Sequence, residues 1–287
     1  IARQGVDHVV ITGDISADAV PGDFESARQL LSSYGLLDSR KLSLIIGNHD
    51  IYGGVHHAED ILSFPRRCKQ TDYEAKVQEF RNWFPEAFEK CMFNEGKVFP
   101  YAKVVGDIVF VGIDSNAHYS QLKNPLGSNG KVTDKDLQRV KGILSADMFR
   151  HKRRIVLIHH HFNKVKTVLP GTMHSVWGAI ERETMKLRDK KSLLKLFREN
   201  DVALVLHGHH HVSSEYERKG LRFMNAGGSV VGPSTDNLSV NFISVTATRI
   251  DTEIHRIPVD ASAISRLKPP LLHTSPLPSS INEHSAA

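Results

Sequence analysis

Four short apolar runs in this chain are each followed directly by residues that can bind a metal ion. The runs are residues 9–11, 44–46, 155–158 and 203–206, and the strings after them are Gly13-Asp14, Gly47-Asn48-His49-Asp50, His159 and Gly208-His209-His210-His211. Apolar runs of this kind are typical of buried strands. In open α/β sheets, ligands bind beyond the carboxyl ends of the strands, so we expect these polar residues to meet at one rim of a sheet.

The side chains delivered to that rim form a donor set without thiolates. They are the carboxylate of Asp14, the carboxamide of Asn48, and the imidazoles of His159, His209 and His211. Oxygen and imidazole donors suit divalent cations such as Mn, Fe or Zn. The sequence therefore predicts a site for divalent metal at this rim.

The order of these motifs resembles the calcineurin-like metallophosphoesterase superfamily, which includes purple acid phosphatases and class III cyclic-nucleotide phosphodiesterases. The resemblance extends over residues 6–229 and is specific as an ordered set. It implies an α/β fold, a layered α-β-β-α sandwich with two mixed central sheets. It also implies a centre of two divalent metal ions such as Mn, Fe or Zn, because two cations about 3.5–4 Å apart can activate a water and neutralise charge on a transferring phosphoryl group. In that centre Asp14 would bridge the two metals, Asn48, His159 and His209 would complete one site, and His211 would serve the other.

One motif of that family has no counterpart here. Its members begin with Asp-x-His on a first strand, whereas only twelve residues precede Gly13, and they hold Asp7-His8 without the required spacing. We therefore expect the chain to be a fragment that lacks its first β-strand and two metal ligands. Such a fragment should bind one metal ion tightly and a second weakly, with slight catalysis.

Four further residues are candidates for chemistry at the metal rim. The resemblance implies that the His49 imidazole stabilises or protonates the leaving group. Asp50 could orient that ring, or it could be a carboxylate at the start of a helix. His160 is a candidate substrate contact because the equivalent residue of relatives often lies at the site. Asn116 is a candidate contact to phosphate or to a metal ligand.

The rest of the pattern indicates one metallophosphoesterase domain over residues 1–258 and a Pro- and Ser-rich tail over 259–287, which we expect to be disordered. A helix over residues 23–34 would join the first two strands as a βαβ unit. Residues 51–97 predict a helical insertion, either a decoration whose aromatic side chains pack on the body or a substrate cap at the metal rim.

Turn, capping and alternation patterns predict the secondary structure of the later segments. Residues 98–105 and 107–113 predict a hairpin, and residues 133–144 a helix capped by Thr133 and Asp136. Alternating segments within residues 215–257 predict antiparallel strands.

Charge and composition narrow the functional classes. The 287 residues contain no apolar stretch long enough to span a bilayer and only two cysteines, which suit a cytoplasmic protein but could also pair. The net charge is +5, and residues 141–200 hold fourteen Lys and Arg against five Asp and Glu. This basic segment would attract substrates that carry phosphate, or it is the solvated face of a helix.

These observations favour a phosphoesterase that uses a metal-bridging hydroxide, with a small-molecule phosphodiester as the first candidate substrate and a phosphomonoester close behind. A nuclease of the same superfamily is an alternative, since the basic segment could hold a nucleic-acid backbone. A catalytically impaired metal-binding scaffold is another. The presence of His49 argues against the scaffold, because a purely structural metal site does not need an acid for a leaving group. The oligomeric state is left open.

Overall fold

The computed structural model describes residues 5–54, 60–93, 96–163, 185–210, 212–228, 237–246 and 248–258 of the chain. Its strands are β1 (Val9–Ile11), β2 (Leu42–Leu44), β3 (Met92–Phe93), β4 (Tyr101–Val105), β5 (Ile108–Ile113), β6 (Arg153–Ile158), β7 (Val202–His207), β8 (Ser214–Arg218), β9 (Leu221–Asn225), β10 (Asn237–Val245) and β11 (Ile250–Pro258). Its helices are α1 (Pro21–Ser33), α2 (His49–Tyr52), α3 (Asp60–Gln70), α4 (Tyr73–Trp83), α5 (Pro85–Phe88), α6 (Asp134–Leu144), the 3-10 turn η2 (Asp147–Phe149) and α8 (Lys190–Glu199).

Seven strands form one mixed sheet in the order β3-β4-β5-β6-β7-β9-β8. The central strands β5, β6, β7 and β9 pair in parallel, while β3, β4 and β8 join the sheet in antiparallel fashion. β6 and β7 are mostly Val, Ile and Leu, which is the composition of strands buried on both faces. The hairpin predicted from residues 98–113 is confirmed as β4–β5, which turns at Gly106 and Asp107.

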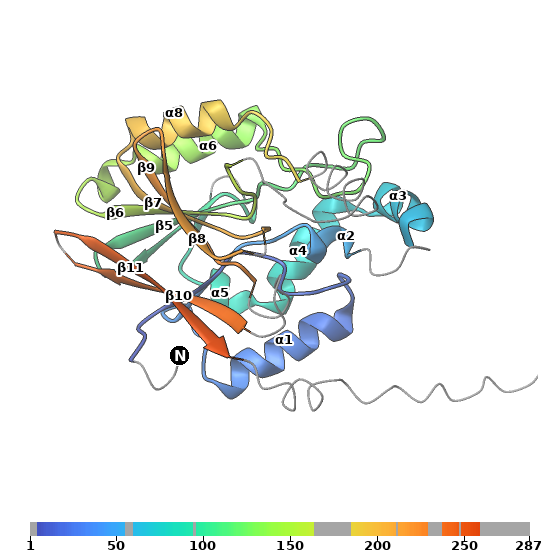
Figure 1. Ribbon diagram of the computed structural model, residues 1–287, viewed down its shortest axis with the longest axis horizontal. Coiled ribbons are helices and arrows are strands. Elements are labelled where there is room, and N and C mark those ends of the chain that lie inside the picture. The colour runs from blue at the N-terminus through green and yellow to red at the C-terminus, as the bar shows by residue number, and fades with distance from the viewer. Residues whose placement is uncertain are drawn as a thin grey trace, which may run out of the picture.

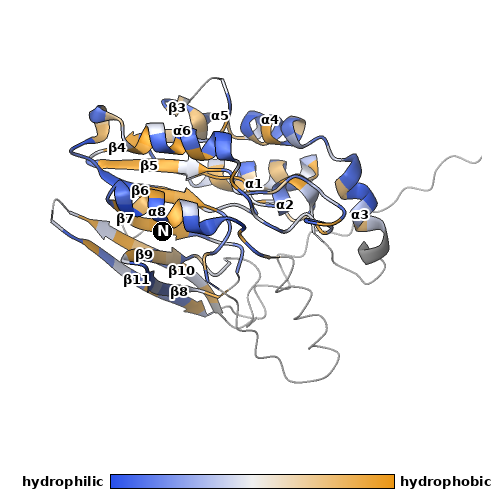
Figure 2. Ribbon diagram, turned by 90° about the horizontal axis from the view of Figure 1, so that it is seen from above, coloured by the Kyte–Doolittle hydropathy of each residue, from blue (hydrophilic) through white to orange (hydrophobic). Residues whose placement is uncertain are grey.

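Two hydrophobic cores lie on opposite faces of this sheet. Because successive side chains of a strand alternate between faces, Ile155 and Leu157 of β6 enter one core while Val156 and Ile158 enter the other. The first core also contains residues of β1, β2, α1, α4 and α5, and the second contains residues of α6 and α8. Figure 1 shows the same division, with α6 and α8 on one side of the sheet and α1 and α4 on the other, and Figure 2 shows the hydrophobic residues of β5 and β6 in orange.

The layered α/β sandwich predicted from the sequence is thereby confirmed. Its second layer of strands consists of the parallel pair β1–β2, and the antiparallel hairpin β10–β11 packs against the same core through Ile243, Val245 and Ile254. The predicted antiparallel strands of the C-terminal half correspond to β8–β9 and β10–β11. Residues 259–287 lie outside the described part of the chain.

The βαβ unit that carries the first two motifs forms as expected. α1 begins with Pro21, whose fixed φ suits a first helical position, and the chain leaves the helix through Gly35 at φ 62°. Phe24 and Leu31 bury one face of α1 in the first core. β1 and β2 then pair in parallel, with Val9 opposite Leu42, so the loops after both strands open at the same end.

The described part of the 51–97 segment is mainly helical, as predicted. Phe80, Phe84 and Phe88 are buried, and the rings of Phe80 and Phe84 lie 6.2 and 6.3 Å from the ring of Phe24 in α1. These aromatic side chains therefore pack on the body of the domain. A second role for the segment as a substrate cap stays a prediction.

Smaller features agree with the sequence patterns. Thr133 caps α6 by accepting the backbone N–H of Asp136, and its hydroxyl donates to the Asp136 carboxylate. Cys68 and Cys91 are both free thiols. Within the described ranges, no helix combines the length and apolar character needed to cross a bilayer.

Phe80 provides a test of how the insertion is anchored. The Phe80→Ala variant removes a fully buried ring, so we expect its free energy of unfolding to fall by about 3–5 kcal/mol. Leu30→Ala is the control, because Leu30 is 60% exposed and its loss should cost less than about 1 kcal/mol. Urea titration followed by circular dichroism measures both. Equal losses in the two variants would contradict a body-packed insertion.

Candidate metal centre

Four of the five predicted metal ligands come together where β1, β2, β6 and β7 end. His159 Nε2 lies 3.2 Å from Asp14 Oδ2, 3.1 Å from Asn48 Oδ1 and 3.1 Å from His209 Nδ1. Potential ligand atoms of Asp14, His159 and His209 all lie within 4.8 Å of one another. The fifth predicted ligand, His211, lies outside the described residues.

The proton positions of His159 make this cluster suited to a cation. His159 Nδ1 lies 2.7 Å from the carbonyl oxygen of Thr12, an arrangement in which only Nδ1–H can donate. In the neutral ring, Nε2 then presents a lone pair to a carboxylate oxygen and an amide oxygen, which are also acceptors. A set of acceptors that face one another favours a positive charge at the centre. The donor set therefore fits a divalent metal ion.

The charges of His159 and Asp14 shift the pKa values of both groups. Burial alone lowers the pKa of His159, but the neighbouring Asp14 carboxylate outweighs it and raises that pKa. Burial raises the pKa of Asp14, yet His159 and His49 together hold it well below its usual value. Asp14 is thus kept as a carboxylate, the form that can ligate a metal.

Close backbone approach brings the first two motifs into contact. A Cβ at Gly47 would lie 2.1 Å from Asp14 Oδ1, and one at Gly13 would lie 2.6 Å from His159 Nδ1. Only glycine leaves space for the neighbouring ligands at these two positions. Asp14 and His209 themselves adopt φ angles of 55° and 66°, a region that side chains disfavour. Backbone of this kind persists where the surrounding contacts impose it.

Asp50 supplies contacts that hold this backbone. Its fully buried carboxylate accepts the backbone N–H groups of Asp14 (2.9 Å), Ser16 (2.9 Å) and Gly47 (2.8 Å). Burial, reinforced by the charge of Asp14, raises the pKa of Asp50 to about 7. Asp50 therefore connects the loop after β1 to the loop after β2.

These contacts do not match the expectation that Asp50 orients the His49 ring. His49 Nδ1 lies 3.0 Å from the carbonyl oxygen of Ala17, and the backbone N–H of His49 donates to Asp14 Oδ1 at 2.9 Å. The Asp50 carboxylate is occupied by backbone donors, so the Ala17 carbonyl orients the ring. His49 remains half-buried beside the cluster, and its Nε2 atom has no hydrogen-bond partner among the described residues.

His160 lies behind the cluster as a fully buried ring. Its Nδ1 lies 2.8 Å from Ser115 Oγ and its Nε2 lies 3.2 Å from the Ser128 carbonyl oxygen, so both nitrogens are engaged. Burial holds its pKa well below the usual value, and the ring lies 4.4 Å from that of His209, centroid to centroid. In this geometry His160 supports His209 and does not present an atom to a substrate.

Asn116 is also buried and holds backbone together. Its Nδ2 donates to the Ile46 carbonyl at 3.1 Å and to Asp114 Oδ1 at 2.9 Å. Ile46 directly precedes Gly47 and Asn48, so Asn116 supports the strand end that carries a ligand. The expected contact with phosphate stays a prediction.

Three of the groups that support this centre were not predicted from the sequence, namely the carbonyls of Thr12 and Ala17 and the hydroxyl of Ser115. The two carbonyls belong to the backbone, which carries no residue-specific signal. Ser115 could have been identified as a candidate because it is a polar residue between Asp114 and Asn116, directly after β5. His8 bonds to the Arg40 carbonyl and to Ser43, and its ring stacks on Phe110.

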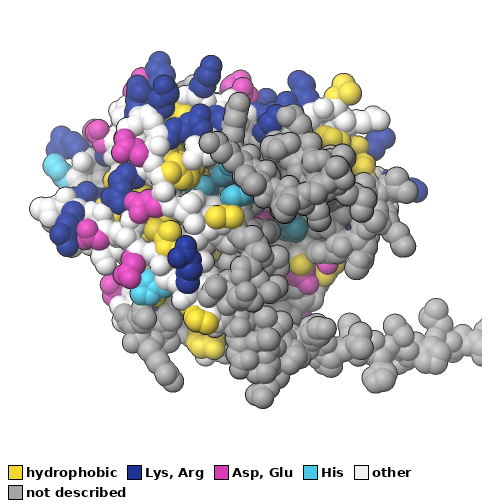
Figure 3. All heavy atoms as spheres, in the orientation of Figure 1, with side chains coloured by type: hydrophobic (Ala, Val, Ile, Leu, Met, Phe, Trp, Pro, Cys, Tyr) yellow, Lys and Arg dark blue, Asp and Glu magenta, His cyan; other side chains and the backbone are white. Residues whose placement is uncertain are grey.

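The described part of the basic segment, residues 141–163 and 185–200, includes the end of α6 and all of α8. Figure 3 shows Lys and Arg side chains gathered over α6 and α8. Lys195 of α8 is largely exposed and pairs with Glu199. This surface matches the interpretation of a solvated helix face.

Asp50 can be tested as a positioning residue. An asparagine side chain has one acceptor oxygen, whereas an aspartate has two, so Asp50→Asn cannot accept all three N–H groups. We therefore expect affinity for Mn²⁺ to fall by roughly 10–100-fold. Asp38→Asn is the control, because Asp38 pairs with Arg40 on the surface and should not affect binding. Calorimetric titration of chelator-stripped protein measures both. Unchanged Mn²⁺ affinity in Asp50→Asn would contradict the positioning role.

Comparison with known proteins agrees with this geometry. The sequence model of the calcineurin-like phosphoesterase family matches residues 1–213. A dimetal phosphatase from Danio rerio has a similar structure, with a TM-score of 0.51 and 13% identity over 90% of this chain and 85% of that one.

Two further solved structures align less closely. Phosphopantetheinyl hydrolase from Mycobacterium tuberculosis aligns with a TM-score of 0.44 and 12% identity over 76% of this chain and 77% of that one. The protein TT1561 of Thermus thermophilus aligns with a TM-score of 0.42 and 12% identity over 88% of this chain and 87% of that one. A search of curated protein sequences gives no match. Because the family model matches well over half of the chain, and the fold is shared, this protein belongs to the calcineurin-like phosphoesterase family.

Proposed function

We propose that this protein is a metal-dependent hydrolase of phosphate esters that acts on a small-molecule phosphodiester. The observation that carries the proposal is the convergence of Asp14, Asn48 and His209 on His159 Nε2, with His49 directly adjacent to a ligand. Family membership supports a hydrolase. The preference for a diester over a monoester rests on the resemblance of the motifs to cyclic-nucleotide phosphodiesterases.

The centre would hold two divalent cations of the Mn, Fe or Zn type. Asp14, Asn48, His159 and His209 would bind one of them, and Asp14 and His211 would bind the other. When bound, such cations supply an activated water and neutralise charge on the phosphoryl group. The buried setting of His159 and His209 strengthens the interaction of this donor set with a cation, because little water competes for it.

The residues of the chain have distinct roles in this reaction. Asp14 contributes the negative charge that holds the cations, and the neutral oxygen of Asn48 keeps the total negative charge low enough for an anionic substrate to bind. His49 is held by the Ala17 carbonyl through Nδ1, which leaves Nε2 to donate a proton to the departing ester oxygen.

The primary test is whether phosphate-ester hydrolysis depends on a metal ion and on Asp14. We expect hydrolysis of bis(p-nitrophenyl) phosphate in Mn²⁺ to exceed hydrolysis of p-nitrophenyl phosphate, and to be lost in chelator and in Asp14→Asn. Asp38→Asn is the matched control, because Asp38 pairs with Arg40 and does not join the cluster. Release of p-nitrophenolate measures every arm. Activity that survives both the chelator and Asp14→Asn would refute the metal-dependent assignment.

The role of His49 is tested through the leaving group. We expect His49→Ala to retain metal and to lower kcat by roughly 10²–10⁴ with a poor leaving group such as an alkoxide. The loss should be smaller with p-nitrophenolate, which departs without a proton. His151→Ala is the control, because His151 is exposed outside the centre. Equal losses with both leaving groups would exclude His49 as the general acid.

A further inference from the structure

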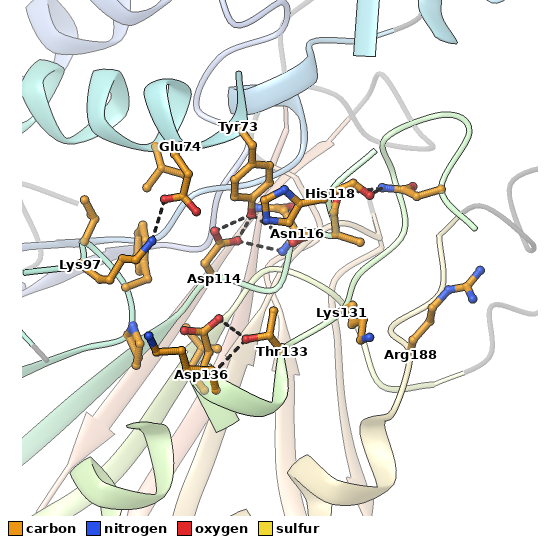
Figure 4. Close-up of a pocket in the computed structure, with 18 of the residues that line it drawn as sticks. Tyr73, Glu74, Lys97, Asp114, Asn116, His118, Lys131, Thr133, Asp136 and Arg188 are labelled. Atoms are coloured by element: carbon orange, nitrogen blue, oxygen red, sulfur yellow. Dashed lines mark hydrogen bonds and ion pairs between the residues drawn. The ribbon is translucent and has the colours of Figure 1, made fainter. Parts of the chain in front are cut away.

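A cavity of about 910 Å³ lies beside the candidate metal centre and is separate from it. It is lined by the first two turns of α4, residues 97–100, parts of the segment 113–131, the first turns of α6 and the 188–189 pair before α8. None of the four described metal-ligand candidates lines it. Figure 4 shows Tyr73, Asp114, Asn116 and His118 at one end of the cavity and Lys131 and Arg188 at the other.

The end of β5 separates the two sites. Ser115 faces the metal centre, because its hydroxyl contacts the His160 ring, while its neighbours Asp114 and Asn116 line the cavity. This is the ordinary alternation of side chains along an extended segment. An occupant of the cavity would therefore lie on the other side of residues 114–116 from the metals.

One end of the cavity presents adjacent cationic side chains. The backbone N–H of Arg188 donates to the Gly130 carbonyl at 2.8 Å, and Gly130 and Leu187 form a parallel bridge. Lys131 and Arg188 each follow one of these bridged residues, so their side chains leave the backbone next to each other. The Arg188 guanidinium donates one N–H to the Lys123 carbonyl at 2.7 Å, and among the described residues neither cation forms an ion pair. Two neighbouring cations without acidic partners are suited to a phosphate group.

The other end presents a flat ring and an unpaired acceptor. The His118 ring stacks on Tyr73 at 4.0 Å, and the Tyr73 hydroxyl donates to Asp114 Oδ2 at 2.6 Å. Asn116 directs its Nδ2 at two acceptors, the Ile46 carbonyl and Asp114 Oδ1, so the amide cannot be reversed. Its Oδ1 is consequently left without a partner in the described structure, although the residue is only 4% exposed. A buried acceptor of this kind gains from a ligand N–H donor.

We propose that this cavity is a second binding site that takes a mononucleotide. The phosphate contacts Lys131 and Arg188, the base lies against the His118 ring, and an exocyclic or ring N–H of the base donates to Asn116 Oδ1. The proposal does not depend on the activity proposed above, since none of the described metal-ligand candidates contributes to the cavity.

The test is calorimetric titration of the full chain in excess chelator, with AMP as the probe and adenosine and inorganic phosphate as its two halves. We expect AMP to bind at least about tenfold more tightly than either half, because both ends of the cavity contribute. The double variant Lys131→Ala/Arg188→Ala should weaken AMP at least about tenfold and leave adenosine unchanged. His118→Ala should weaken both AMP and adenosine.

Two controls distinguish this site from others on the chain. Lys195→Ala removes an exposed charge of α8 away from the cavity lining, and Asp14→Asn alters the metal centre, so both should bind AMP like the parent protein. The proposal is overturned if AMP does not bind, if the double variant binds it unchanged, or if Asp14→Asn abolishes binding. Phosphate binding as tight as that of AMP would overturn the assignment of a nucleotide.

Discussion

The buried carboxylate of Asp50 connects the two loops on which the candidate metal centre depends. It accepts backbone N–H groups from Asp14, Ser16 and Gly47. Without these acceptors three backbone donors near the centre would lose their partners, at a cost of about 1–3 kcal/mol for each one left buried and unpaired. The positive φ of Asp14 and its close approach to Gly47 persist because this network imposes them.

The seven-stranded sheet positions His159 and His209, the two histidines of the candidate centre. β6 and β7 are adjacent parallel strands, so His159 and His209 leave the sheet at the same end. The Thr12 carbonyl accepts from His159 Nδ1 and so keeps the ring hydrogen on that nitrogen. Ser115 and Ser128 contact the two nitrogens of His160, which lies against His209. The candidate ligands are thus held by partners on other strands and loops, an arrangement that fixes ring orientation and tautomer.

Much of the secondary structure and of the candidate metal centre could be predicted from the sequence, because both depend on local patterns of residues. Period-two and continuous apolar runs identified the strands, and the helix predicted over residues 23–34 is found as α1 (Pro21–Ser33). The donor types of Asp14, Asn48, His159 and His209 indicated a metal centre, and the structure brings these four together. The helices of the 51–97 segment were also predicted, but the packing of Phe80 and Phe84 on Phe24 depends on a contact between distant parts of the chain.

The amino-acid sequence was sufficient for the family, for the order of the motifs and for the residues that could ligate a metal, because each of these is a property of residue type and short spacing. It was not sufficient for the roles of Asp50 and His160. Asp50 was expected to orient His49 but binds backbone donors, and His160 was expected at the substrate but is buried behind His209. Except for Gly47, the hydrogen-bond partners of these two side chains lie 30 or more residues away in the chain. Backbone groups and buried hydroxyls of this kind acquire a position only when the strands and loops that carry them have packed.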